Sequence, residues 1–554
     1  MAVNSQASES FFWIKPSQVL SQVKQYLQVS FRGDLAGGVT TSVVALPLAL
    51  AFAVASGVPP QSGLYTAIVA GIVAALFGGS PVQITGPTGA MAVILIGIVA
   101  KYGLEKVWLA GVIAGMIQIA LGMARLGQLV KFIPYPVTAG FTNGIAVIIF
   151  CGQLNNFFGL TLPHSDHFLV DIGDTFKHIS EINWAAVGLA GVVILTKLLW
   201  PRLSTAVPGS LMGLILATAI ATYWQLEVPR IGEIPQSLPS PHGILNWQDL
   251  NLGLIRELIN PALALAALGS IESLLSAVVA DSLTVRDKHD SNRELIGQGL
   301  ANVVVPFFGG IPATGAIART AVNVRAGGCT RLSGVIHGVV LALIVLLLAP
   351  LASQIPLAAL AGILMVTSVR MIEWEAIELL LRSAYSDLAV MILTWMVTIV
   401  FDLVLAVEVG LVAAGALFIK RMSELKLAKT LETEVFPAGV PLELSKQVAV
   451  YRVDGPMFFG AAERFVTYLR DEPTVRILIL RMRFVPIMDT TGLVALEDIY
   501  RDLHQRGCRL VLTGLQPPVR ELLERSGFLE KLGPDNCFET TDQAIQFFAL
   551  EKVF

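Results

Sequence analysis

Long apolar stretches separated by short polar connections fill the chain from about residue 35 to about residue 420. They are long enough for full or broken membrane-spanning helices, of which a full one needs about 20 apolar residues. The pattern therefore predicts a polytopic α-helical membrane protein with about fourteen segments, near 35–57, 62–79, 88–100, 107–125, 134–153, 184–200, 208–224, 258–280, 294–308, 314–324, 333–350, 357–370, 387–402 and 404–420. At about 1.5 Å of rise per residue, the third and the tenth segment are too short to cross a bilayer.

The two short segments begin with the same sequence, Thr-Gly-Ala, and each follows a copy of one longer motif. Residues 77–90 read FGGSPVQITGPTGA, and residues 308–316 read FGGIPATGA. Gly, Pro and Thr interrupt a helix and free backbone N–H and C=O groups, which a bilayer tolerates only where they line a cavity or lie inside protein. Interrupted segments at matching places in two halves of a chain indicate the binding site of a transporter.

The two halves of the membrane region can be laid over each other. Asp34 leads the first span and Asn260 leads the eighth, and the second and ninth spans both end in Phe-Gly-Gly. Each half has about seven spans, an odd number, so the second half is expected to be inverted in the membrane. The two broken helices are then expected to face each other near the midplane.

The distribution of charge predicts the orientation. The connections expected inside carry most basic residues, whereas the outer loop 160–183 carries four acidic residues and only Lys177. By the positive-inside rule, both termini are expected to be cytoplasmic, with the protein in the plasma membrane. Lys101 and Lys106, on the outer side, are mild exceptions.

The composition changes after about residue 425. Short β-type runs near 448–453, 475–480 and 509–515 alternate with amphipathic helical patterns near 460–470, 489–506 and 517–526, which predicts a small α/β domain. The expected organisation is a cytoplasmic N-terminal segment (1–32), a transmembrane domain (33–422), a linker (423–445) and a cytoplasmic domain (446–554). Residues 1–30 contain a Phe-Phe-Trp patch at 11–13 that is typical of an interfacial helix.

The overall composition agrees with a membrane protein. The chain has 554 residues, of which 54% are hydrophobic and only 14% charged, whereas soluble domains carry about 25% charged residues. No basic domain indicates a nucleic-acid partner. The four cysteines (Cys151, Cys329, Cys508 and Cys537) and the seven histidines form no metal-ligand spacing, and the cysteines are interpreted as small buried residues. No cofactor and no metal other than a coupling Na⁺ is expected, and without a nucleophile–base pair an enzyme is the weakest reading.

Thr88 and Thr314, which begin the two short segments, are the first candidate site residues. A helix N-terminus presents unpaired N–H groups and a partial positive charge, and therefore attracts anions. Gly89 and Gly315 would let a ligand approach the backbone closely, and the threonine hydroxyls can donate or accept. Taken alone, either threonine reads as an ordinary helix cap. The repetition favours a site at both ends.

Glu272 lies in an apolar stretch that is otherwise interrupted only by serines. An ionisable group at that depth is a functional-site hypothesis by default. Ser276 is one helical turn on and shares its face, so the pair is expected to take up H⁺ or Na⁺ as a coupling ion. The alternative is a buried glutamate hydrogen-bonded to a serine or to broken backbone.

Arg319 follows the second Thr-Gly-Ala by about one turn. On a short helix facing a cavity, it could attract an anion or pair with Glu272. The alternative is an arginine that snorkels to the membrane interface.

Thr490 and Thr491 follow Asp489 at the start of a predicted helix in the C-terminal domain. Asp489 and Thr490 suit N-capping. An exposed threonine there would also place a phosphate on the positive end of the helix dipole. Both readings stay open, with capping favoured over regulation.

Nearly the whole chain resembles the SulP / solute-carrier-26 family of anion transporters. The stretches that carry the resemblance are 46–53 (LPLALAFA), 57–65 (GVPPQSGLY), 86–88 (GPT), 271–275 (IESLL) with 279–281 (VAD), 292–299 (NRELIGQG) and 308–315 (FGGIPATG). The resemblance implies a fourteen-span, 7+7 inverted-repeat fold with core and gate subdomains and an elevator-like motion. It also implies a homodimer and a cytoplasmic STAS domain from about residue 440, with which a cytoplasmic partner could associate.

The resemblance also implies where the ligands bind. The family's anion site lies between the third and tenth half-helices, which places the anion at Thr88, Gly89, Ala90, Thr314, Gly315, Ala316 and Arg319. The eighth-span acid of the family matches Glu272, with Ser276 beside it. The small anion and the lipid bilayer are the expected partners.

Three positions bear on the substrate. Members that transport bicarbonate resemble this chain over residues 279–284, but they have Asp at the position of Glu272. A glutamate at this position is more similar to proton-coupled members of the family, including one that transports dicarboxylates. Many sulfate members have Tyr where the chain has Ser62. The expected function is a secondary active transporter of small inorganic anions such as sulfate or bicarbonate, coupled to H⁺ or Na⁺. The alternatives are a C4-dicarboxylate:H⁺ symporter, an anion channel or exchanger of the same family, and a sensor that signals through its C-terminal domain.

Overall fold

The structure is a computed structural model of the whole chain, in which the chain divides into two compact units, Met1–Leu411 and Val412–Phe554. It describes residues 30–128, 133–162, 168–204, 207–241, 252–284, 288–382, 385–401, 403–422, 426–429, 447–457 and 476–550. Residues 1–29 of the expected interfacial helix and the expected helix 460–470 lie outside these ranges, and of the predicted linker 423–445 only residues 426–429 are described.

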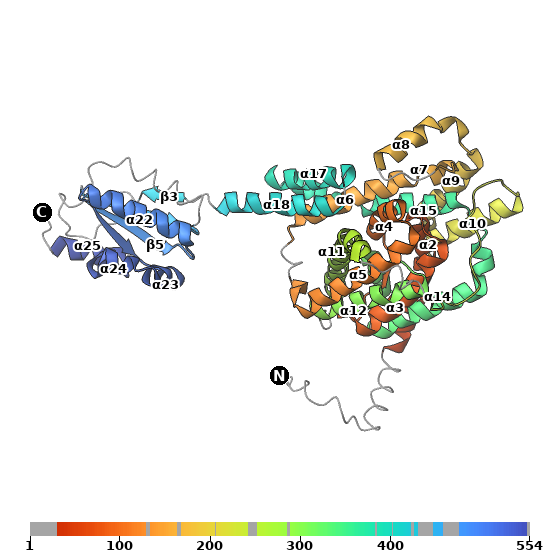
Figure 1. Cartoon of the computed structure of the whole chain (residues 1–554), viewed down its shortest axis with the longest axis horizontal. Coiled ribbons are helices and arrows are strands. Elements are labelled where there is room, and N and C mark those ends of the chain that lie inside the picture. Colours follow the sequence, from red (N-terminus) through yellow and green to blue (C-terminus); the bar gives the residue numbers. More distant parts are fainter. Residues whose placement is uncertain are drawn as a thin grey trace, which may run out of the picture. The chain divides into compact units, whose positions relative to one another are not determined.

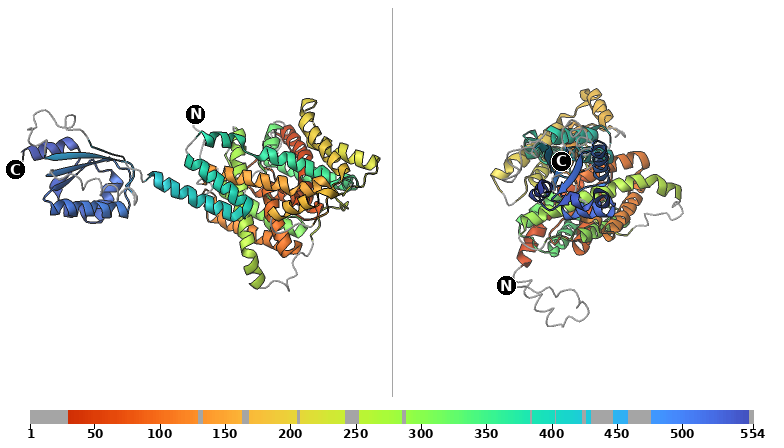
Figure 2. Two further views of the ribbon diagram at one scale, coloured as in Figure 1. Left: turned by 90° about the horizontal axis from the view of Figure 1, so that it is seen from above. Right: turned by 90° about the vertical axis from the view of Figure 1, so that its left-hand side faces the viewer.

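The first unit is built from helices that pack side by side (Figure 1; Figure 2). Each of the apolar stretches predicted from the sequence coincides with one helix, to within a few residues. The helices are α2 (Phe31–Ala55), α3 (Pro60–Phe77), α4 (Gly89–Tyr102), α5 (Leu104–Met123), α6 (Tyr135–Gly152), α7 (Leu154–Phe158), α8 (Phe168–Lys177), α9 (Trp184–Leu199), α10 (Gly209–Tyr223), α11 (Leu252–Leu283), α12 (Ser291–Val304), α13 (Ile317–Arg325), α14 (Arg331–Ala352), α15 (Leu357–Met371), α16 (Trp374–Leu381) and α17 (Tyr385–Val400). A further helix, α18 (Leu403–Met422), begins in this unit and continues past Leu411 into the second. The short helices α7, α8 and α16 were not predicted.

Prolines fix several helix starts. Pro60 is the first residue of α3, and Pro134, Pro208 and Pro356 immediately precede α6, α10 and α15. A proline suits these positions because its missing N–H would have no partner in the first helical turn and its fixed φ is already helical. The apolar runs therefore begin as helices at defined residues.

Among the described residues, eight helical stretches are long and apolar enough to cross a membrane, judged by length and composition. These helices differ in how much of their apolar part is covered by the rest of the protein. In α14, 28% of the apolar stretch is buried, and in α11, 61% is buried. An exposed apolar helix in a bilayer faces lipid, so α14 lies at the periphery and α11 in the interior. The helices α4, with 14 residues, and α13, with nine, are too short for a full span.

The two copies of the repeated motif meet as a pair of short strands. Strands β1 (Thr85–Gly86) and β2 (Thr314–Gly315) pair antiparallel, with Thr85 opposite Gly315 and Gly86 opposite Thr314. All four residues are buried. Strand pairing satisfies the backbone groups that the interrupted helices leave free, which is the condition for irregular backbone at membrane depth.

The second unit contains a five-stranded sheet in the order β3-β4-β5-β6-β7, formed by β3 (Lys426–Lys429), β4 (Val448–Asp454), β5 (Ile477–Phe484), β6 (Arg509–Thr513) and β7 (Cys537–Phe538). Strands β4 to β7 are parallel, and β3 adds an antiparallel edge. Helices α22 (Thr490–Gln505), α23 (Pro517–Arg525) and α24 (Phe528–Leu532) share one buried apolar cluster with the sheet, and α25 (Thr541–Leu550) shares a second. The α/β domain predicted from the sequence is confirmed.

Candidate functional site

Glu272, on α11, lies where the two copies of the motif meet. Its Oε2 accepts hydrogen bonds from the hydroxyls of Thr88, at 2.8 Å, and Thr314, at 2.7 Å. The two hydroxyl oxygens are 3.4 Å apart. One carboxylate oxygen therefore joins the start of α4, strand β2 and the middle of α11.

Thr88 is the N-cap of α4, where its hydroxyl oxygen also accepts from the backbone N–H of Met91 at 3.4 Å. The position of Thr88 is therefore compatible both with an ordinary helix cap and with a residue of the anion site. The N–H groups of Gly89 and Ala90 belong to the first turn of α4, where no intrahelical partner exists. Gly89 lies against apolar side chains, because an added Cβ would meet Phe52 at 3.2 Å and would overlap Ile149.

The second copy differs from the first at its helix start. Thr314 and Gly315 form strand β2, and α13 begins only at Ile317, with Ala316 as its N-cap. The Gly315 N–H donates to Ser273 Oγ at 3.0 Å, and the Ala316 N–H donates to the Ile84 carbonyl at 2.9 Å. The expectation of two helices that start with Thr-Gly-Ala therefore holds for α4 only, because pairing with β1 keeps the second copy extended.

The first turn of α13 consequently offers different donors from those expected. The N–H groups of Ile317 and Ala318, rather than those of Gly315 and Ala316, have no intrahelical partner. The sequence carries no signal for this shift, because it depends on the pairing of two segments far apart in the chain.

Ser276 contacts a different residue from the one that its spacing suggested. Its hydroxyl lies 3.2 Å from Thr320 Oγ1, which accepts from the Ile84 N–H at 3.0 Å. Ser273, one residue after Glu272, is the α11 serine that binds the second copy. Ser276 thus braces the first copy against α13, and no hydrogen bond to Glu272 is found for it among the described residues.

Arg319 lies inside the protein, with 2% of its surface exposed, which excludes an arginine that snorkels to the interface. Its Nη2 donates to the Pro87 carbonyl at 2.6 Å. Its Nη1 has no hydrogen-bond partner among the described residues. A Cβ added to Gly86 would lie 2.5 Å from that Nη1, so a side chain at 86 would require the guanidinium to shift.

Gly315 has a matching role in the second copy. An added Cβ would overlap the side-chain amide of Gln83 and would approach Ser273 Cα at 3.1 Å. Each strand thus contains a glycine on which a polar side chain from the neighbourhood of the other strand packs. Arg319, which follows β2, packs on Gly86 in β1, and Gln83, which precedes β1, packs on Gly315 in β2.

We expect Gly315→Ala to destabilise the purified protein by about 1–3 kcal/mol, because overpacking forces neighbours out of position. Thermal unfolding in detergent measures the change. Gly97→Ala is the matched control: Gly97 is in α4, and an added Cβ meets nothing within 4 Å. The control should be neutral or stabilising by about 0.5–1 kcal/mol. Equal unfolding temperatures for the two variants would contradict the close packing of Gln83 on Gly315.

A row of buried polar residues on α12 was missed by the sequence reasoning. Glu294 Oε2 accepts from the N–H groups of Gly79, at 2.7 Å, and Ser80, at 2.9 Å, and its Oε1 accepts from Gln83 Nε2 at 2.9 Å. Gln298 and Asn302 follow at intervals of four residues and bind further parts of the two copies. The signal that could have found them is this spacing in a segment that also carries the family resemblance.

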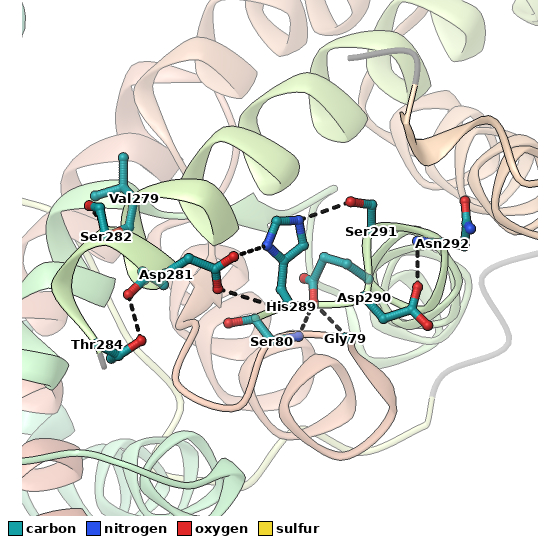
Figure 3. Close-up of polar contacts among 12 residues, drawn as sticks. Gly79, Ser80, Val279, Asp281, Ser282, Thr284, His289, Asp290, Ser291 and Asn292 are labelled. Carbon is teal, nitrogen blue, oxygen red and sulfur yellow. Dashed lines mark hydrogen bonds and ion pairs between the residues drawn. The ribbon is translucent and has the colours of Figure 1, made fainter. Parts of the chain in front are cut away.

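The connection from α11 to α12 is held by a second polar cluster (Figure 3). His289 Nδ1 lies 2.7 Å from Asp281 Oδ2, and its Nε2 lies 3.0 Å from Ser291 Oγ. The next residue, Asp290, donates its N–H to the Gly79 carbonyl at 3.4 Å. The end of α11 is thereby fixed beside the start of the first copy.

In the second unit, Asp489 is the N-cap of α22, and its Oδ1 accepts from the Gly492 N–H at 2.8 Å. Thr490 and Thr491 are both exposed at the start of this helix. Their hydroxyls are accessible, so phosphorylation there stays a prediction. Burial raises the pKa of the Cys508 thiol above its ordinary range, which favours the uncharged, less reactive form.

No group of three or more His, Cys, Asp or Glu side chains that could hold a metal ion occurs in the described ranges. The oxygen atoms around Glu272 are its own carboxylate and the hydroxyls of Thr88 and Thr314. Oxygen ligands of this kind suit a hard monovalent cation as well as a proton.

Two family models match the chain. The model described as the sulfate permease family matches residues 31–394, and the STAS domain model matches residues 440–544. A relative from Bacillus subtilis that bears the name "Putative sulfate transporter YvdB" is 40% identical over 528 residues, covering 94% of this chain and 98% of its own. The bicarbonate transporter BicA of a Picosynechococcus species is 33% identical over 540 residues, covering 93% and 94%.

Solved structures show the same fold. The transmembrane domain of a cyanobacterial bicarbonate transporter, BicA, aligns with a TM-score of 0.62 at 36% identity, covering 70% of this chain and 97% of that one. The murine solute carrier 26 family member A9 anion transporter, in its inward-facing state, aligns with a TM-score of 0.83 at 20% identity, covering 99% and 97%. At 20% identity, the second likeness concerns the fold alone.

Proposed function

The chain belongs to the sulfate permease family and ends in a STAS domain, and from this premise we propose that it is a secondary active transporter of a small inorganic anion. Sulfate and bicarbonate are the substrate types named for its relatives. The observation that supports this proposal most directly is the Glu272 carboxylate held by Thr88 and Thr314, one hydroxyl from each copy of the motif. Members of the family are transporters rather than enzymes.

The anion is proposed to bind beside the first turn of α4, where the N–H groups of Gly89 and Ala90 and the helix dipole favour negative charge. Arg319 supplies a full positive charge from within the protein and has a donor to spare at Nη1. In a water-poor site, such a charge attracts an anion far more strongly than at a surface. Glu272 opposes this attraction as long as it is ionised.

Counting donors suggests how binding of the anion is coupled to a cation. Each threonine hydroxyl has one hydrogen to donate, and the hydroxyls of Thr88 and Thr314 both donate theirs to Glu272. A proton or a sodium ion at Glu272 removes the charge that holds these hydrogens. The two hydroxyls can then turn toward the anion, so that cation and anion favour each other's binding.

The remaining parts of the proposal follow the orientation predicted from charge. We infer that both termini are cytoplasmic, because the positive-inside rule favours this orientation, and we propose the plasma membrane as the location. The fourteen-span inverted repeat, the elevator-like movement of a core against a gate, and a homodimer are proposed with it. The antiparallel pairing of the two motif copies is compatible with two halves of opposite orientation.

A tracer-uptake panel in proteoliposomes tests the function. Sulfate, bicarbonate, nitrate and fumarate are each added as competitors of the labelled anion, with and without Na⁺ and at two pH values. We expect one inorganic anion to compete best and one cation to be required, because the site offers a single carboxylate. Preference for fumarate with a pH gradient would instead identify a C4-dicarboxylate:H⁺ symporter. Single-channel currents that account for the flux would identify a channel and contradict coupled transport.

A further inference from the structure

The row of polar residues on α12 binds both copies of the motif. Glu294, Gln298 and Asn302 recur every four residues, so they lie on one face of the helix. Their exposed fractions are 2%, 0% and 1%. Polar side chains this deeply buried are costly unless they are hydrogen-bonded, and each of the three is bonded to a segment of the repeated motif.

Gln298 is the member that hydrogen-bonds directly to both copies of the motif. Its Oε1 accepts from the hydroxyl of Thr85, in β1, at 3.2 Å. Its Nε2 donates to the carbonyl of Ala313, the residue before β2, at 2.7 Å. One side-chain amide therefore fixes the two strands relative to each other, and α4 follows directly from the first of them.

Asn302 fixes the second copy alone. Its Oδ1 accepts from the Ala313 N–H at 2.7 Å, and its Nδ2 donates to the Ala313 carbonyl at 3.0 Å. The same Nδ2 lies 2.8 Å from Gln118 Oε1 on α5. Asn302 thus ties the second copy to α12 and, through Gln118, to α5.

Glu294 fixes the first copy through the N–H groups of Gly79 and Ser80 and through Gln83. Gln83 in turn packs its side-chain amide on Gly315 in β2. Successive members of the row are about 6 Å apart along the axis of α12. The rigid helix therefore holds its three attachment points at set distances.

From these contacts we propose that Gln298 is a positioning residue for transport: it sets the separation of the two motif copies and thereby the affinity for the anion. This inference rests on the proposed function, because the affinity in question is that of the transported anion. Gln298 hydrogen-bonds to neither Glu272 nor Arg319. Its effect passes through the backbone of the two strands to Thr88 and Thr314, which hold the carboxylate.

Replacing Gln298 by Met keeps the length of the side chain and removes both hydrogen bonds. A displacement of about 1 Å in a binding geometry can cost up to 100-fold, so we expect the KM for anion uptake to rise at least roughly tenfold, with the maximal rate within about twofold of the parent. Thr85→Val should raise the KM in the same direction. The double variant should be no worse than Gln298→Met alone, because both changes break the same connection.

Gln153→Met is the matched control, since Gln153 is also buried, with 3% exposed, but follows α6 and contacts neither motif copy through a described hydrogen bond. Gln153→Met should leave the KM at the parent's value. If Gln298→Met lowers only the unfolding temperature and leaves the KM unchanged, Gln298 is a structural residue and the inference is wrong.

Hydrogen–deuterium exchange of the full-length protein without anion separates this inference from the proposed function. Gln298→Met should increase exchange in both 84–90 and 313–317. Thr66→Val should increase exchange at Ile311, in the second copy, and leave 84–90 unchanged, because Thr66 Oγ1 accepts from the Ile311 N–H at 2.7 Å. Unchanged exchange in either segment of Gln298→Met overturns the inference that Gln298 holds the two copies together, whatever the uptake assays show. Increased exchange in both segments, with no uptake of any anion by the parent protein, overturns the transport function and leaves Gln298 as the residue that holds the two copies together.

Discussion

Replacing Glu272 by Gln is expected to remove nearly all anion uptake that is driven by an imposed cation gradient, while the protein stays in the membrane. An amide of the same shape can still accept a hydrogen bond, but it cannot take up a proton and is a poor ligand for Na⁺. The hydroxyls of Thr88 and Thr314 are then no longer held by a charge. Because cation and anion binding are no longer linked, gradient-driven accumulation should fall by roughly 100-fold, near the upper end of ordinary coupling free energies. Tracer accumulation in proteoliposomes measures the loss.

Glu257→Gln is the control for this change, because Glu257 is on the same helix, α11, and is exposed. It should accumulate the anion as the parent does. Anion exchange without a gradient gives a second readout, and Glu272→Gln should retain it better than it retains accumulation. If the two variants accumulate the anion equally against a gradient, Glu272 has no part in coupling.

Replacing Arg319 by Met is expected to weaken anion binding rather than coupling. Arg319 is buried, and its Nη1 donor has no partner in the described part of the chain. A hydrogen bond to a charged group contributes about 1.5–3 kcal/mol, so the KM for the anion should rise about 10- to 100-fold. The dependence of the remaining uptake on the cation gradient should persist, because Glu272 is intact.

Arg325→Met provides the comparison, since Arg325 is in the same helix, α13, and is exposed. Its KM should stay within about twofold of the parent, as expected for a surface charge. Arg319→Lys should recover part of the affinity, because it restores the charge without the planar donors. A KM for Arg319→Met equal to that for Arg325→Met would show that the anion binds elsewhere.

Much of the fold follows from hydrophobic periodicity. The boundaries of α9, predicted at 184–200 and found at Trp184–Leu199, illustrate how sharply a membrane span is marked when polar residues flank it. The small α/β domain could also be predicted from the sequence, since its short β runs alternate with amphipathic helical patterns. The helical membrane domain and the STAS domain are confirmed by the family matches. The count of fourteen spans, their inverted repeat and the domain boundaries stay predictions.

The candidate site was predictable only where a single residue stood out. Glu272 was conspicuous because a carboxylate in an apolar helix is rare, and repetition drew attention to Thr88 and Thr314. The use of the Gly315 and Ala316 N–H groups by Ser273 and Ile84 could not be predicted, because it depends on strand pairing between distant segments. For the same reason, helical spacing assigned Ser276 to Glu272, whereas the structure places it against Thr320.

The α12 row shows a second limit of sequence reasoning. Glu294, Gln298 and Asn302 are ordinary residues for an amphipathic helix, and their spacing alone fits a solvated face. Their burial becomes visible only when the two motif copies are seen packed against them. A polar stripe in a membrane protein therefore needs its packing partners before it can be interpreted.

The room that Gly86 leaves for Arg319 constrains the order in which this protein can change during evolution. A side chain at 86 would meet the guanidinium of Arg319, which is buried and would have to shift, so a lineage that keeps the arginine is expected to favour the glycine. Loss of the arginine would remove this constraint, and Gly86 could then drift. An arginine restored later would then meet the new side chain at 86 and could not take its present position unchanged. The positive charge at position 319 is therefore expected to be lost more easily than it is regained.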